Sequence, residues 1–157
     1  MSTQKVRDYL KKFNLEDRVM EFDVSSATVE LAAEAVGVEP ARIAKSMSFK
    51  NDEGAVLVVT AGDTKIDNRK FKDFFHKKAT MLSAEEALKF TGYAVGGVCP
   101  FDNPEGLPVY LDVSMKRFET VFPAAGTANS AVKLTCEELE KTSKAIQWID
   151  VCKGWEN

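Results

Sequence analysis

Apolar residues recur every three or four positions in several stretches of the chain, which is the period of a helix with one buried face. Gly37 and Gly92 each follow such a stretch, where a residue in the left-handed conformation often ends a helix. Ser83 and Thr135 each precede a glutamate by three positions, the pattern of a capping box that opens a helix. The predicted helices cover residues 5–13, 28–36, 67–76, 83–90 and 135–143.

Other stretches are short, rich in β-branched residues or alternate apolar with polar positions, and these features predict strands. The tetrapeptide NDEG separates two of these strands and predicts a hairpin. Several strands follow one another without a crossover helix, so the pattern favours an α+β fold with a mixed, strongly curved sheet over a doubly wound parallel one. The predicted strands cover residues 19–24, 44–50, 55–61, 107–113, 130–134 and 146–151.

Length and composition predict one soluble globular domain over residues 1–157, with 45% hydrophobic and 29% charged residues. No apolar run reaches the roughly 20 residues of a membrane span, and the start MSTQKVRDYLKKF lacks the apolar core of a signal peptide. Three cysteines without a CxxC pair argue against a disulfide framework or a zinc site, and neither standard nucleotide-binding loop occurs. We therefore expect a cytoplasmic protein with no membrane contact, no metal and no cofactor.

Positive charge gathers in one segment, although the net charge of the chain is −3. The segment 65–78 carries six basic residues against two aspartates and coincides with a predicted helix. Such a patch can bind phosphates, or it can be a solvated helix face. The same helix carries three phenylalanines that fit a core, so we expect no specific binding of duplex DNA. The basic residues are Lys65, Arg69, Lys70, Lys72, Lys77 and Lys78.

Lys45 is an anomaly within the predicted strand IAKSMSFK. Alternation with a period of two places it on the same face as Met47 and Phe49. A lysine on the apolar face of a half-buried strand is costly unless its ammonium group reaches a partner or a cavity. Lys45 is therefore a candidate cation at the mouth of a pocket, or a side chain that extends out past the end of the strand.

Two glycine-containing loops are candidate ligand contacts. The loop 96–100 (GGVCP) can bring main-chain N–H groups close to a ligand and donate them to a carbonyl that becomes an oxyanion, or it can be a tight turn before a strand. The loop 124–130 (AAGTANS) fits a pocket wall or close backbone packing. The only histidine, His76, lies in the basic segment, and no GxSxG motif occurs, so a serine–histidine mechanism is not indicated.

Five segments, taken in order from Asp23 to Cys152, resemble the YbaK/ProX family of aminoacyl-tRNA deacylases. This family is related to the editing insertion domain of bacterial prolyl-tRNA synthetases. The segments are TVELAAEAVGVEPARIAKSMSF, the AGD of residues 61–63, TGYAVGGVCPF, LPVYLDVSMKRFETVFPAAGTANSAVKLT and WIDVC. The resemblance implies an α+β fold with a mixed, barrel-like sheet and flanking helices. It also implies hydrolysis of the ester that joins a mischarged amino acid to the terminal adenosine of tRNA, without a metal.

The resemblance also suggests site residues, because the pocket lysine of the family matches Lys45 and its GxxxP loop matches residues 96–100. We expect a free-standing trans-editing deacylase that acts on a small amino acid on tRNA-Pro, with an aminoacyl-tRNA synthetase as a further suggested partner. The alternative is a binding module for tRNA or an aminoacyl nucleotide that lacks catalysis. The expected catalytic residues are Lys45, Gly96, Gly97 and Val98. The expected substrate contacts are Thr28, Ser46, Met47, Cys99, Pro100 and Gly126. The six basic residues of segment 65–78 are expected to contact the phosphates of the acceptor end.

Overall fold

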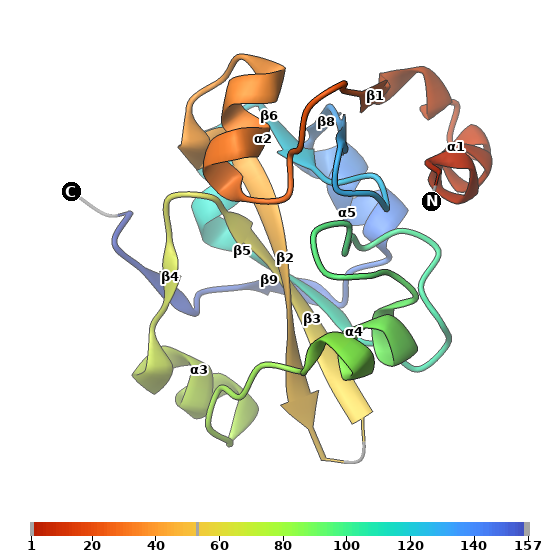
Figure 1. The fold of residues 1–157 in the computed structure, drawn as a ribbon. Coiled ribbons are helices and arrows are strands. Elements are labelled where there is room, and N and C mark those ends of the chain that lie inside the picture. The colour runs from red at the N-terminus through yellow and green to blue at the C-terminus, as the bar shows by residue number, and fades with distance from the viewer. Residues whose placement is uncertain (1, 53, 156–157) are drawn as a thin grey trace.

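A six-stranded mixed sheet forms the centre of the computed structural model, which describes residues 2–52 and 54–155 (Figure 1). The strand order is β8-β6-β2-β3-β5-β9, and the sheet curls with helices packed around it. β2 and β3 form the predicted antiparallel hairpin, whereas β3–β5, β5–β9 and β2–β6 are parallel pairs. The α+β class with a mixed, curved sheet is thus confirmed. The strands are β2 (Ile43–Asn51), β3 (Gly54–Ala61), β5 (Val109–Asp112), β6 (Thr120–Pro123), β8 (Leu134–Thr135) and β9 (Gln147–Ile149).

Four short strands form two separate antiparallel pairs. β1 (Val19–Glu21) pairs with β7 (Ser130–Val132), and β4 (Lys65–Ile66) pairs with β10 (Cys152–Lys153). The single strand predicted over residues 130–134 is therefore divided between β7 and β8, which have different pairing partners, and a local pattern does not reveal this. Of the strand predicted over residues 146–151, only β9 forms, and β10 begins beyond its end.

Three helices begin at the capping residues that the sequence indicates, and two of them end at the indicated glycines. Thr28 accepts a hydrogen bond from the Leu31 N–H at the start of α2, and both predicted capping boxes are present. Gly37 and Gly92 end α2 and α4 with φ of +87° and +85°, the left-handed region where glycine is favoured. The α-helices are α1 (Gln4–Lys11), α2 (Val29–Val36), α3 (Asn68–Phe75), α4 (Ala84–Thr91) and α5 (Cys136–Ser143). Short 3-10 turns cover Glu16–Arg18, Pro40–Arg42 and Val113–Arg117.

The two faces of the β2–β3 hairpin belong to different hydrophobic clusters. Leu57 and Val59 face the main core, which α1 and α5 also contribute to. Phe49 faces a second cluster with Val56 and Val58, and Phe71 of α3 packs on it with ring centroids 4.9 Å apart. The helix α3 therefore covers one face of the hairpin. No helix within the described ranges is long and apolar enough to cross a membrane.

Candidate functional site

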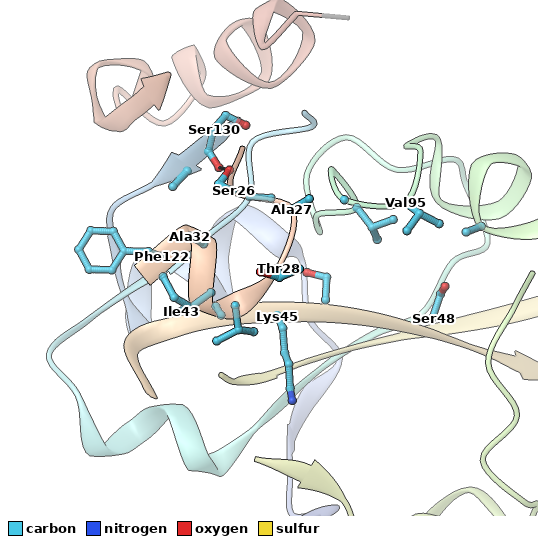
Figure 2. Close-up of a pocket in the computed structure, with 18 of the residues that line it drawn as sticks. Ser26, Ala27, Thr28, Ala32, Ile43, Lys45, Ser48, Val95, Phe122 and Ser130 are labelled. Carbon is cyan, nitrogen blue, oxygen red and sulfur yellow. Dashed lines mark hydrogen bonds between the residues drawn. The ribbon is translucent and has the colours of Figure 1, made fainter. Parts of the chain in front are cut away.

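A cavity of about 250 Å³ lies between α2, β2 and the loop that follows α4 (Figure 2). One end is buried, with small or apolar side chains that are 7% exposed or less: Ser26, Ala32, Ile43, Phe122, Ser130 and Ala131. The other end is open and carries Met81 and Val95, which are 58% and 67% exposed. The cavity thus has a closed end for a small group and an open end toward solvent.

The wall that β2 supplies is an uncovered strand edge. Pairing with β6 stops at Ala44, and the next edge contacts are the Leu82 N–H donating to the Ser48 carbonyl and the Lys50 N–H donating to the Thr80 carbonyl. The main-chain groups of alternate residues on a strand point to the same side, so those of Ser46 point to this uncovered edge. The Ser46 hydroxyl oxygen is buried and has no hydrogen-bond partner among the described residues. Ser46 therefore brings unpaired polar groups to the cavity wall.

Lys45 contributes to the same wall, but its side chain points away from the cavity. It shares the face of Met47 and Phe49, as predicted, and this is the face that α3 covers. Its ammonium group donates to the Thr64 carbonyl, and Figure 2 shows the side chain on the opposite side of β2 from Thr28 and Ser48. Burial lowers the pKa of Lys45, while nearby Cys152 and Asp63 act in the opposite direction. Direct contact with a ligand in the cavity would require this ammonium group to leave Thr64.

The loop 96–100 supplies the facing wall through Gly96 and Val98. Gly96 has φ of +96°, a conformation that favours glycine. The Gly97 N–H already donates to the Ala94 carbonyl at 2.9 Å, so this amide is occupied within a turn. A Cβ at Gly97 would lie 2.6 Å from the main-chain carbonyl carbon and oxygen of Gly126. Gly97 therefore allows the two loops to pack closely. In this wall, the main-chain N–H groups that could bind a ligand are those of Gly96 and Val98, on either side of Gly97.

The other expected substrate contacts separate into two groups. Thr28 and Ser46 line the cavity. Met47 packs against the second cluster, Pro100 lines a different surface hollow, and Gly126 is buried beneath Tyr93. Cys99 is fully buried outside the lining, and burial raises the pKa of its thiol to about 12. A thiol in that state is a poor nucleophile, so Cys99 is a packing residue.

The basic segment does not border the cavity. It lies on β4, α3 and the turn after α3, and Figure 1 places α3 at the far end of the view from α2. Lys70 pairs with Asp150 at 3.1 Å, and Lys77 pairs with Asp52. Within the described chain, no cluster of three His, Cys, Asp or Glu side chains could hold a metal ion.

Several cavity residues were not predicted as site residues: Ser26, Ala27, Ser48, Met81 and Val95. Ser48 and Val95 lie within two of the family segments, which were a signal that could have found them. The loop 124–130 was a further signal, because its small residues fitted either a wall or close packing. The structure contains both, since Ala124 and Ser130 line the cavity while Gly126 packs on Gly97.

Comparison with known proteins identifies the family of this chain. Residues 23–142 match the aminoacyl-tRNA editing domain family. "Uncharacterized protein YwhH" of Bacillus subtilis is 54% identical over 99% of this chain and 100% of its own length. "Putative Cys-tRNA(Pro)/Cys-tRNA(Cys) deacylase EbsC" of Enterococcus faecalis is 29% identical over 71% of this chain and 70% of its own. A crystal structure described as "a putative trans-editing enzyme for prolyl tRNA synthetase" superimposes with a TM-score of 0.88 and 30% identity, covering 98% of this chain and 99% of that one. The chain belongs to the family of aminoacyl-tRNA editing domains.

Proposed function

We propose that this protein is a free-standing deacylase that hydrolyses the ester of a small amino acid with an uncharged side chain, mischarged on tRNA, with tRNA-Pro as the carrier. The observation that carries the proposal is the cavity with one closed end and one open end, in a chain of the editing family. The relative named "Putative Cys-tRNA(Pro)/Cys-tRNA(Cys) deacylase EbsC" and the neighbour described as "a putative trans-editing enzyme for prolyl tRNA synthetase" support this choice, because tRNA-Pro is the carrier that both names have in common.

The shape of the cavity sets the direction in which such a substrate binds. A tRNA is far too large to enter, so its terminal nucleoside belongs at the open end and the amino acid at the closed end. Ala32, Ile43 and Phe122 border that end, and the whole cavity measures only about 250 Å³, which favours a short side chain. Lys45 is the one charged residue of the described lining, and its ammonium group points away, which favours an amino acid with an uncharged side chain. Alanine, cysteine, serine and threonine all satisfy these conditions.

Ester hydrolysis at this site needs few special groups. Water attacks the acyl carbon, the bond from that carbon to the ribose oxygen breaks, and the ribose oxygen takes a proton that the water supplies. The protein must hold the carbonyl and stabilise its developing negative charge, for which one main-chain donor contributes about 10²–10³-fold in rate. We assign this role to the amides of Gly96 and Val98, because the Gly97 amide is occupied. Lys45 acts as a positioning residue that ties β2 to Thr64 and adds positive potential nearby.

The test is a deacylation assay on tRNA-Pro charged with labelled alanine, cysteine, serine, threonine or proline. The wild type is expected to release at least one of the four small noncognate amino acids and to spare proline. Ala32→Leu fills the closed end and is expected to abolish release, whereas Ala35→Leu, on the same helix but outside the lining, should retain it. Lys45→Ala is expected to lower release. Absence of release with every ester, or equal activity of the Ala32→Leu and Ala35→Leu variants, would contradict the proposal.

A binding module without catalysis is the second candidate. Two observations favour it: the Gly97 amide is already bonded, and the Lys45 ammonium group faces away from the cavity. This candidate predicts salt-dependent binding of tRNA without any release of the amino acid. Filter-binding and deacylation measurements on the same charged tRNA samples separate the two functions.

A further inference from the structure

Large apolar side chains are exposed at the open end of the cavity. Val95 is 67% exposed and Met81 is 58% exposed, and both line the cavity. Exposed apolar side chains at the rim of a cavity mark a binding surface more often than isolated ones elsewhere. Leu82 and Val98 extend the apolar lining behind them.

The two side chains come from separate segments that are each held in place. Met81 forms a bridge to Phe49, and the hydrogen bonds from Lys50 to Thr80 and from Leu82 to Ser48 attach its segment to the edge of β2. Val95 precedes Gly96 in the loop that the turn at Ala94 shapes. Figure 2 shows Val95 at the same end of the cavity as Ser48. Two separately anchored segments therefore bring the apolar side chains of Met81 and Val95 to the same cavity.

The chemistry of this rim fits a flat heterocycle better than a phosphate. No arginine or lysine of the described chain lines this end of the cavity, so a phosphate has no cation to meet there. A nucleobase has two apolar faces and needs a surface of this kind. We propose that Met81 and Val95 hold the terminal adenine of the charged tRNA between their side chains. This inference rests on the proposed function, which places the nucleoside at the open end.

Kinetics with matched variants test the assignment. Val95→Ser and Met81→Ser are compared with Ile146→Ser, which removes an equally exposed residue (59%) outside the lining. On the mischarged tRNA, the first two are expected to raise KM by about tenfold with little change in kcat, the range for losing a few apolar groups from a pocket. On the ethyl ester of the same amino acid, which has no base, Ile146→Ser should match the wild type, and Val95→Ser and Met81→Ser should lose much less than they lose on tRNA. Equal KM values for the three variants on tRNA, or equal losses on both substrates, would overturn the assignment.

A binding measurement separates failure of this inference from failure of the proposed function. Selective labelling of methionine methyl groups allows the Met81 resonance to be followed by NMR during titration with adenosine, which requires no catalysis. We expect the Met81 signal to shift with adenosine in the wild type and in Ile146→Ser, but not in Val95→Ser. No shift in the wild type overturns the inference even if the protein hydrolyses charged tRNA. A wild type that forms dimers, with monomeric Val95→Ser, would instead assign the rim to a second copy and overturn it.

Discussion

Replacing Gly97 by alanine tests the packing of the two loops that shape the cavity. The added Cβ would lie 2.6 Å from the Gly126 carbonyl group and 2.8 Å from the Thr127 nitrogen, and all of these are main-chain atoms. Ordinary contact begins at 3.4 Å, so the loops must separate by about 0.8 Å. Overpacking of this kind costs about 1–3 kcal/mol, because neither backbone can yield as a flexible side chain does. For a domain of this size, we expect Tm to fall by about 2–12 °C.

The same displacement moves the wall that Gly96 and Val98 provide. A shift approaching 1 Å in a positioning element can lower a rate by about 10²-fold, so deacylation should fall more than stability alone explains. The matched control is Gly54→Ala, where the nearest heavy atom is 4.0 Å from the new Cβ and φ is not positive. Urea and thermal unfolding of both variants, with deacylation at a temperature where both are folded, give the comparison. A Gly97→Ala protein as stable and active as Gly54→Ala would refute the reasoning.

Three further outcomes are expected. Ser46→Ala removes a buried hydroxyl without a partner, so urea unfolding should show the variant about 1 kcal/mol more stable than wild type; a loss of stability would reveal a partner in solution. Burial lowers the pKa of Lys45 below its ordinary 10.5, so the unfolded chain binds the proton more tightly than the folded one. Wild-type stability should therefore rise, relative to Lys45→Met, as pH increases from the lowered pKa to 10.5, and parallel pH profiles would contradict this. Cys99, buried with a pKa of about 12, should escape a thiol reagent at pH 8 until urea is added, as mass spectrometry of the labelled peptides can check.

Local features of the sequence determined the helices and the hairpin. The capping residues Thr28, Ser83 and Thr135 and the terminal glycines Gly37 and Gly92 act within a few residues of their own helices. A sequence window therefore contains all the groups that decide where these elements begin and end. The five family segments added the editing assignment, which the family match confirms.

Pairing between distant strands was decided only by the tertiary structure. The segment 130–134 divides because its two parts join different partners, β1 and β6. The strand predicted over residues 146–151 ends at Ile149, and the strand that follows it at Cys152 pairs with β4 instead of β5. Asp112 is fully buried, and its carboxylate accepts hydrogen bonds from the N–H groups of Ser114 and Val151. A carboxylate can be buried when such donors satisfy it, and Val151 comes from a distant segment.

The candidate site shows most clearly the difference between what the local sequence determines and what tertiary packing decides. Alternation correctly placed Lys45 on the face of Phe49, since a period of two depends only on the strand itself. It could not tell which face borders the cavity, because α3 covers one face while α2 and the loop 96–100 border the cavity on the other side. The glycine at position 97 likewise indicated an unusual backbone conformation. The structure shows that a glycine is needed there because the main chain of Gly126 approaches closely. Sequence patterns determine which residues share a surface, and packing between distant segments decides what that surface meets.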